Sequence, residues 1–190
     1  QGGDITPKGF VPASMAKHNG KDFADQAYVK AGTDYNLKEA KALFAKGLKQ
    51  VGKKSLSLTL MGADDDDTKR ATEFVQSQLT KLPGLKITNS NIPFKSKLTK
   101  MENQQFDIGL SAWIADYPDP SNFLDLMTSN NSYNDGKWSN KQYDALIKKS
   151  ESTDANNETA RWNDMVQAEK ILMNQQGFVP LYQQGQAAYL

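Results

Sequence analysis

Hydrophobic positions follow a helical period in one part of the chain and the period of a strand in the next. Between residues 37 and 48, apolar side chains recur every three or four positions opposite a row of lysines, which predicts an amphipathic helix. Asn36 and Glu39 have the spacing of a capping box at the start of that helix. From Ser55 to Met61, leucine alternates with serine and threonine, which predicts a strand.

The same two periods continue to residue 112 and predict alternating helices and strands. The aspartates at 64–67 precede apolar residues at helical spacing, where acidic side chains stabilise a helix N-terminus. The predicted elements are a helix from these aspartates to Pro83-Gly84, a strand at 85–89, a helix across 94–101 and a strand at 106–112. Because short helical crossovers link successive strands, we expect an α/β fold with a mostly parallel sheet and helices packed on it.

The N-terminal part of the chain carries a weaker pattern. Residues 1–35 show neither period, which predicts an extended lead-in with short turns before an α/β body at 36–190. The tetrapeptide Gly-Phe-Val-Pro occurs at 9–12 and again at 177–180, but its surroundings do not repeat. We therefore interpret the two copies as coincidence and not as an internal repeat.

Two helices and a strand are predicted for the C-terminal part. Ser139 and Gln142 have the spacing of a capping box for the first helix, and the second carries apolar residues from 162 to 173. Residues 178–182 predict a short apolar strand. Pro180 has no N–H to donate to a neighbouring strand, so this strand is expected near a sheet edge.

Composition narrows the possible functions. The 190 residues, of which 38% are hydrophobic, suffice for one ordinary domain, and we treat residues 1–190 as a single lobe. The 23 Lys and Arg residues nearly balance the 22 Asp and Glu residues, giving 23 − 22 = +1, so nucleic acid is not an expected partner. The longest uncharged, mainly apolar run, 108–115, is far shorter than the roughly 18 to 20 residues of a membrane-spanning helix.

Reactive side chains are few. The chain has no Cys, which excludes thiolate nucleophiles and sulfur-ligated metals. Its one histidine, His18, lies in a polar stretch, and we expect a solvated loop residue and not a catalytic base. We expect no cofactor and no metal.

The segment Trp113-Ile114-Ala115-Asp116-Tyr117-Pro118-Asp119-Pro120 holds the densest chemistry in the chain. Its prolines fix φ and bias the preceding residues toward extended backbone, so the turn is stiff. Asp119 before Pro120 is typical of a helix start. Asp116 follows the third predicted strand, at the end of the sheet where α/β proteins bind ligands. The pattern leaves two roles open for it, a preorganised recognition carboxylate or a turn aspartate bonded to its own backbone.

With these residues in view, the chain closely resembles the C-terminal lobe of the oligopeptide- and dipeptide-binding proteins of ABC importers, which belong to the peptide and nickel group of extracellular solute-binding proteins. The resemblance covers essentially the whole chain. The matching segments are Trp113–Pro120 with Phe123-Leu124, Trp138-Ser139-Asn140 with Tyr143-Asp144, Gly9–Pro12, the helix at 36–48, Arg161 and Pro180-Leu181-Tyr182.

The resemblance implies a site and a role for each part of it. In that family the aspartate at the position of Asp116 pairs with the α-ammonium of the bound peptide. The residues before it run beside the peptide backbone, and Trp113 walls the cleft. The implied ligand-binding residues are Ser111, Ala112, Trp113, Ile114, Ala115, Asp116 and Tyr117.

The resemblance also implies an architecture, partners and a location. The chain is expected to be one lobe of a two-lobed, type II periplasmic-binding-protein-like clamshell, without the N-terminal lobe and lipid anchor. The expected partners are a peptide, a membrane permease and that N-terminal lobe. The expected location is the cell surface, as a lipoprotein, or the periplasm. The receptor is expected to catalyse nothing.

Three alternatives remain beside this interpretation. A carboxylate-based hydrolase would pair Asp116 with Asp119 or Asp125. Calcium at 64–67 would need spaced ligands that the run lacks. A third is a nickel, sugar or signalling-peptide ligand within the same group. Outside the turn, the candidate rim residues are Tyr133, Trp138 and Asn140, although loop aromatics more often anchor their own domain.

Overall fold

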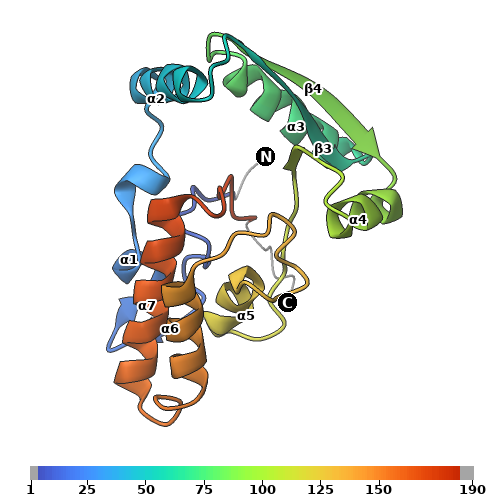
Figure 1. Ribbon diagram of the computed structural model, residues 1–190. Helices are drawn as coiled ribbons and strands as arrows, with labels where there is room; N and C mark the ends of the chain where they lie inside the picture. The colour runs from blue at the N-terminus through green and yellow to red at the C-terminus, as the bar shows by residue number, and fades with distance from the viewer. Residues whose placement is uncertain (1–3, 185–190) are drawn as a thin grey trace. The chain divides into compact units, whose positions relative to one another are not determined.

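The chain folds into two compact units, which a computed structural model describes over residues 4–184 (Figure 1). Contacts group Gln1–Asp34 with Trp113–Leu190 in the first unit and Tyr35–Ala112 in the second. That residues 1–190 together serve as one ligand-binding lobe stays a prediction.

A parallel three-stranded sheet forms the centre of the second unit. Its strands are β3 (Leu56–Ala63), β4 (Leu85–Ile92) and β5 (Ile108–Gly109), in the order β4-β3-β5. The register of β3 with β4 runs from Leu56 opposite Leu85 to Ala63 opposite Ile92. The predicted α/β class and the parallel sheet are confirmed.

Helices connect these strands as predicted. The connecting helices are α3 (Asp66–Leu79) and α4 (Phe94–Glu102), while α2 (Leu37–Gln50) precedes the first of the strands. Helix α3 covers one face of β3 and β4 (Figure 1). Asn36 caps α2 as predicted, since its side-chain oxygen accepts from the N–H of Glu39. Its side-chain amide, and not its backbone N–H as in a capping box, donates to the Glu39 carboxylate. Asp65 caps α3 by accepting from the N–H of Thr68.

The third strand is shorter than its alternating pattern predicts. Only Ile108 and Gly109 pair with β3, and the N–H of Leu110 adds one bond to the carbonyl of Met61. Just before these two residues, the carboxylate of Asp107 accepts a 2.8 Å hydrogen bond from the N–H of Thr59, where a longer strand would offer a backbone carbonyl. After it, the chain leaves the sheet edge.

The first unit is helical. The helices α6 (Lys141–Glu151) and α7 (Glu158–Gln175) pack side by side (Figure 1), and α5 (Ser121–Leu124) with the 3₁₀ turn η2 (Asp125–Met127) contacts α7. The inward face of α7 is fully buried. The buried core residues are Val11, Phe23, Ala27, Phe123, Leu124, Met127, Tyr143, Ile147, Trp162, Met165, Val166, Ala168 and Leu172.

The N-terminal residues belong to this core, so describing them as a lead-in to a body at 36–190 is wrong. They form a two-residue hairpin of β1 (Lys17–His18) and β2 (Lys21–Asp22), the short helix α1 (Phe23–Gln26) and the 3₁₀ turn η1 (Lys30–Gly32). Val11 and Phe23 are 1% and 0% exposed. None of these elements is long enough to show a period in sequence.

A buried carboxyl group ties the N-terminal segment to α7. Glu169 is 0% exposed and accepts hydrogen bonds from the N–H of Phe10 at 2.8 Å and of Val11 at 3.3 Å. Burial raises the pKa of Glu169 to about 8, although these bonds act in the opposite direction. Gly9 makes the approach possible, because a Cβ atom there would lie 1.9 Å from a Glu169 oxygen.

Two details of the C-terminal part differ from the sequence analysis. Asn140, and not Ser139, caps α6, since its side chain accepts from the N–H groups of Gln142 and Tyr143. Residues 178–182 form no strand; instead Ile5 pairs with Gln183 in an isolated antiparallel bridge. Pro180 supplies no N–H to extend that pairing.

The two Gly-Phe-Val-Pro segments meet in space. The rings of Phe10 and Phe178 lie 4.4 Å apart between centroids. The second segment also needs its glycine, because a Cβ atom at Gly177 would lie 2.7 Å from the ring of Trp138. Phe10 and Phe178 both pack against the core of the first unit.

His18 is packed, contrary to the expectation of a solvated loop residue. Its side chain is 11% exposed, and Nδ1 lies 3.0 Å from a carboxylate oxygen of Glu158. Its ring stacks on Trp162 with 5.4 Å between centroids. The hairpin brings it onto α7, a long-range contact that its polar sequence neighbours do not reveal.

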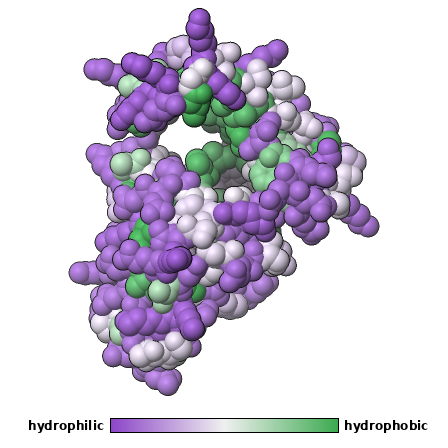
Figure 2. Space-filling model, viewed as in Figure 1, coloured by the Kyte–Doolittle hydropathy of each residue, from purple (hydrophilic) through white to green (hydrophobic). Residues whose placement is uncertain are grey.

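The surface is largely polar where the helices face solvent. Figure 2 shows hydrophilic side chains over much of α2, the helix whose outer face carries the lysines. None of the helices within residues 4–184 combines the length and apolar character needed to cross a bilayer.

Candidate functional site

The predicted turn begins at Trp113, which is fixed from two sides. Its indole N–H donates to the side-chain oxygen of Asn122 at 2.8 Å. Its ring meets Tyr133 edge to face, with 5.0 Å between centroids. Asn122 is a buried residue of α5, so Trp113 is attached to the core of the first unit.

The middle of the turn is exposed and makes few bonds. Ile114 is 73% and Tyr117 48% exposed, while Ala115 is half-buried against the core. No backbone hydrogen bond to residues 111–116 occurs in the described part of the chain. The backbone of this segment therefore presents free donors and acceptors.

Asp116 is exposed at the centre of this segment. Within residues 4–184 its carboxylate takes part in no hydrogen bond or ion pair, so it is not a turn aspartate bonded to its own backbone. A free carboxylate beside unpaired backbone groups can accept bonds from a cationic ligand.

Asp119 closes the turn with three bonds. One carboxylate oxygen accepts from the N–H of Ser121 at 2.9 Å, as expected of an aspartate at a helix start. The guanidinium of Arg161, from α7, donates to both oxygens at 2.8 Å. Burial acts to raise the pKa of Asp119, but the bonds from Arg161 and Ser121 outweigh it and hold that pKa below its usual value.

A second pair of carboxyl groups, Asp125 and Glu151, lies close to Arg161. Burial, followed by the neighbouring charge of Glu151, raises the pKa of Asp125 to about 7, although Arg161 acts in the opposite direction. One oxygen of Asp125 is buried without a hydrogen-bond partner. Arg161 is thus influenced by three carboxyl groups, those of Asp119, Asp125 and Glu151, and it forms its hydrogen bonds with Asp119.

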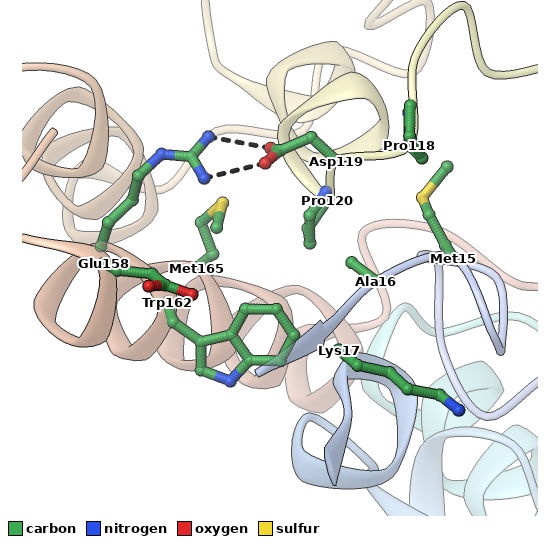
Figure 3. A pocket seen from close by; sticks show the side chains of 10 residues that line it. Met15, Ala16, Lys17, Pro118, Asp119, Pro120, Glu158, Trp162 and Met165 are labelled. Carbon is green, nitrogen blue, oxygen red and sulfur yellow. Dashed lines mark hydrogen bonds and ion pairs between the residues drawn. The ribbon is translucent and has the colours of Figure 1, made fainter. Parts of the chain in front are cut away.

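A cavity of about 410 Å³ lies behind the turn (Figure 3). Pro118 and Pro120 line one side of it, with Asp119 between them, and Trp162 and Met165 of α7 line another. The turn is therefore not packed directly on α7 here, and the ion pair drawn with dashed lines bridges the two.

The structure brings part of the predicted site together. Trp113, Ile114, Ala115, Asp116 and Tyr117 form one turn of the first unit, whereas Ser111 and Ala112 are the last residues of the second. Among the candidate rim residues, Tyr133 contacts Trp113. Trp138 packs on Tyr143, and Asn140 caps α6, so both serve their own unit.

Two residues that hold the turn are absent from the predicted site. Asn122 lies nine positions after Trp113, and nothing in the sequence distinguishes it from an ordinary helix residue. Arg161 appears only as a matching residue, and its partner lies 42 positions away. The one available signal for Arg161 was its place beside the apolar face of its predicted helix.

The alternative chemistries find their residues otherwise engaged. Asp65 of the 64–67 run caps α3, and Asp66 and Asp67 pair with Lys69 and Arg70. For a hydrolase, Asp119 is bound to Arg161, and one oxygen of Asp125 is buried. Asp65, Asp66, Asp67 and Asp119 thus have structural partners that explain their positions.

Replacing Asp125 with asparagine is expected to flatten the pH dependence of the first unit's stability. The folded pKa of about 7 lies above the unfolded value of about 3.9, so the folded state binds the proton more tightly. This contribution to stability is complete below about pH 4 and is lost as the pH rises through about 7.

Urea denaturation followed by tryptophan fluorescence measures this effect, because all three tryptophans lie in the first unit. Asp4→Asn removes an exposed carboxyl and serves as the control. Its free energy of unfolding should depend on pH as in the parent chain. If the free energy of unfolding of Asp125→Asn changes with pH as steeply as that of the parent chain, the assignment is contradicted.

The sequence profile of the bacterial extracellular solute-binding proteins, family 5 Middle, matches residues 1–135. The dipeptide-binding protein of Lactococcus lactis subsp. cremoris is 42% identical over 154 residues, covering 80% of this chain and 28% of its own. A dipeptide-binding protein of Bacillus subtilis is 32% identical over 177 residues, covering 91% of this chain and 31% of its own. The chain thus spans less than a third of the length of these two relatives.

Solved structures agree with the fold. The crystal structure of a peptide-binding protein of a peptide ABC transporter superposes with a TM-score of 0.91 at 42% identity, covering 97% of this chain and 82% of that one. Listeria monocytogenes OppA bound to peptide superposes with a TM-score of 0.85 at 32% identity, covering 96% of this chain and 34% of that one.

Proposed function

The chain belongs to the bacterial extracellular solute-binding proteins of family 5, and on this premise we propose that it is part of a receptor that captures oligopeptides for the permease of an ABC importer. The observation that carries the proposal is the turn at 113–119, where an exposed, unpaired carboxylate adjoins a backbone without partners. The relatives named as dipeptide- and peptide-binding proteins support it.

In this proposal Asp116 receives the α-ammonium of the peptide. An ammonium enclosed in a cleft loses its hydration, and a fixed carboxylate compensates with charge-assisted hydrogen bonds worth roughly 1.5 to 3 kcal/mol net. The turn holds that carboxylate in place before the ligand arrives, which lowers the entropy cost of binding.

The backbone from Ser111 to Ala115 then pairs with the peptide main chain. Main-chain pairing is indifferent to side-chain identity, which suits a receptor for varied peptides. Trp113 and Tyr117 flank the carboxylate along the turn and would form part of the wall. The relatives named as dipeptide- and peptide-binding proteins support an amine-bearing ligand over a sugar or a nickel ion.

The remaining parts of the proposal concern the whole receptor. The members of the family are extracellular solute-binding proteins. We propose that the whole receptor is a cell-surface lipoprotein in which an N-terminal lobe closes over the site. Capture and delivery require no covalent chemistry, so the receptor is proposed to bind and not to catalyse. Incubation with peptide and glycan mixtures, followed by mass spectrometry, tests this, since turnover would favour the hydrolase.

Calorimetry with the chain and with the full-length receptor tests the proposal directly. We expect the full-length receptor to bind oligopeptides and this chain alone to bind them at least about a hundredfold more weakly, because one wall of the cleft buries far less ligand surface. Nanomolar binding by the isolated chain would show that the second lobe is dispensable. No binding of any peptide by the full-length receptor would overturn the function.

A further inference from the structure

We propose that Arg161 is a positioning residue for Asp116, which acts through Asp119 and touches no ligand. The inference rests on the proposed function, since it assigns a support to the same turn. Its physical basis is that the Asp116 side chain has no hydrogen bond or ion pair of its own within residues 4–184.

Hydrogen bonds and ion pairs hold the turn at its two ends, and Ala115 between them packs against the core of the first unit. On one side, Trp113 is bonded to Asn122 of α5. On the other, Asp119 is bonded to Ser121 and to Arg161. Between them, Asp116 has no hydrogen bond or ion pair within residues 4–184. The place of the Asp116 carboxylate, directly after Ala115, therefore depends on the Asp119 end of the turn.

The Arg161 end depends on the ion pair because packing is incomplete there. The cavity of about 410 Å³ separates Pro118 and Pro120 from the helix that carries Arg161. Two parallel N–H···O bonds of 2.8 Å fix both the distance and the angle of the Asp119 carboxylate, which one point charge would not do. The prolines pass this constraint to Asp116, three residues away, because they remove backbone freedom.

The scaffold behind Arg161 is rigid. The same helix, α7, carries Met165, Ala168 and Leu172, each 0% exposed, in the core of the first unit. The ion pair itself is partly exposed, with side-chain exposures of 26% for Arg161 and 32% for Asp119. Partly exposed pairs contribute little to global stability, so its main effect falls on the turn.

Loss of Arg161 would also leave Asp119 facing other carboxyl groups. Asp125 and Glu151 lie close enough to Arg161 to influence it, and the charge of Asp119 acts on Asp125. Without the guanidinium, repulsion among these groups favours movement of the Asp119 end of the turn into the space that the cavity leaves.

The test uses the full-length receptor and a matched pair of peptides, one with a free amino terminus and one N-acetylated. In Arg161→Met we expect the free-amino peptide to bind about tenfold more weakly or worse, as outer-shell partners of binding groups typically cost, with little change for the acetylated peptide. Arg161→Lys keeps the charge without the fork and should restore binding only in part. Lys170→Met, on the same helix, is the control and should bind both peptides normally.

A double-mutant cycle separates positioning from a general structural role. In the Asp116→Asn background, adding Arg161→Met should change binding of the free-amino peptide by less than about twofold, because the positioned group is already gone. If Arg161→Met does not fold, Asp119→Asn, which keeps an oxygen for Ser121, is expected to give the same pattern. Equal losses for both peptides, or additive losses in the cycle, overturn the inference. Failure of the parent receptor to bind free-amino peptide would instead overturn the proposed function.

Discussion

Replacing Asp116 with asparagine in the full-length receptor is expected to weaken peptides with a free amino terminus by two to three orders of magnitude. The ammonium would remain in the closed cleft without its counter-charge, and leaving one member of a buried pair alone costs about 3 to 5 kcal/mol. Each 1.4 kcal/mol corresponds to about a tenfold change in affinity. Calorimetry with one peptide in free and N-acetylated form measures the difference.

The acetylated peptide provides the internal control, because it carries no ammonium and should bind both proteins alike. Asp4→Asn provides the protein control, since this exposed carboxyl lies outside the turn. An equal loss for both peptides in Asp116→Asn would remove the ammonium role, even if peptide binding itself is confirmed.

Replacing Gly9 with alanine is expected to lower the free energy of unfolding of the first unit by about 2 to 4 kcal/mol. The new Cβ atom would lie 1.9 Å from a carboxyl oxygen of Glu169, which is buried and cannot turn away freely. Moving Glu169 would break the bonds that it accepts from Phe10 and Val11 and leave those N–H groups buried. Urea denaturation followed by tryptophan fluorescence reports on this unit.

Gly136→Ala is the matched control, because nothing lies within 4 Å of the corresponding Cβ position in the same unit. A second arm measures coupling: in a Glu169→Ala background the cost of Gly9→Ala should shrink, since the clashing oxygen is absent. Full additivity of the two substitutions would show that the contact between Gly9 and Glu169 is not the cause.

Local patterns were sufficient for the second unit. The capping box at Asn36, the alternation in β3 and the aspartates before α3 each involve residues a few positions apart. The parallel sheet follows from the helical crossovers alone. The strand at 106–112 was too long, because its alternating residues cannot reveal that Asp107 takes a bond of the neighbouring strand.

Long-range contacts explain what the patterns missed in the first unit. Glu169 accepts hydrogen bonds from Phe10 and Val11, which lie 159 and 158 positions earlier in the chain. The partner of Arg161 lies 42 positions earlier. Ser139 and Asn140 are adjacent and both able to cap a helix, so sequence could not choose between them. The resemblance located the turn and Asp116, but the groups that hold the turn became visible only in the structure.

The backbone at 111–116, left without backbone partners, carries a hazard as well as a use. Such an extended stretch is a template onto which a second molecule can add a strand, the first step of edge-to-edge aggregation. The chain limits this through a negative charge at Asp116 and through Pro118 and Pro120, which offer no N–H for a growing ladder. A cognate ligand that occupies the stretch would therefore also act as a shield against self-association.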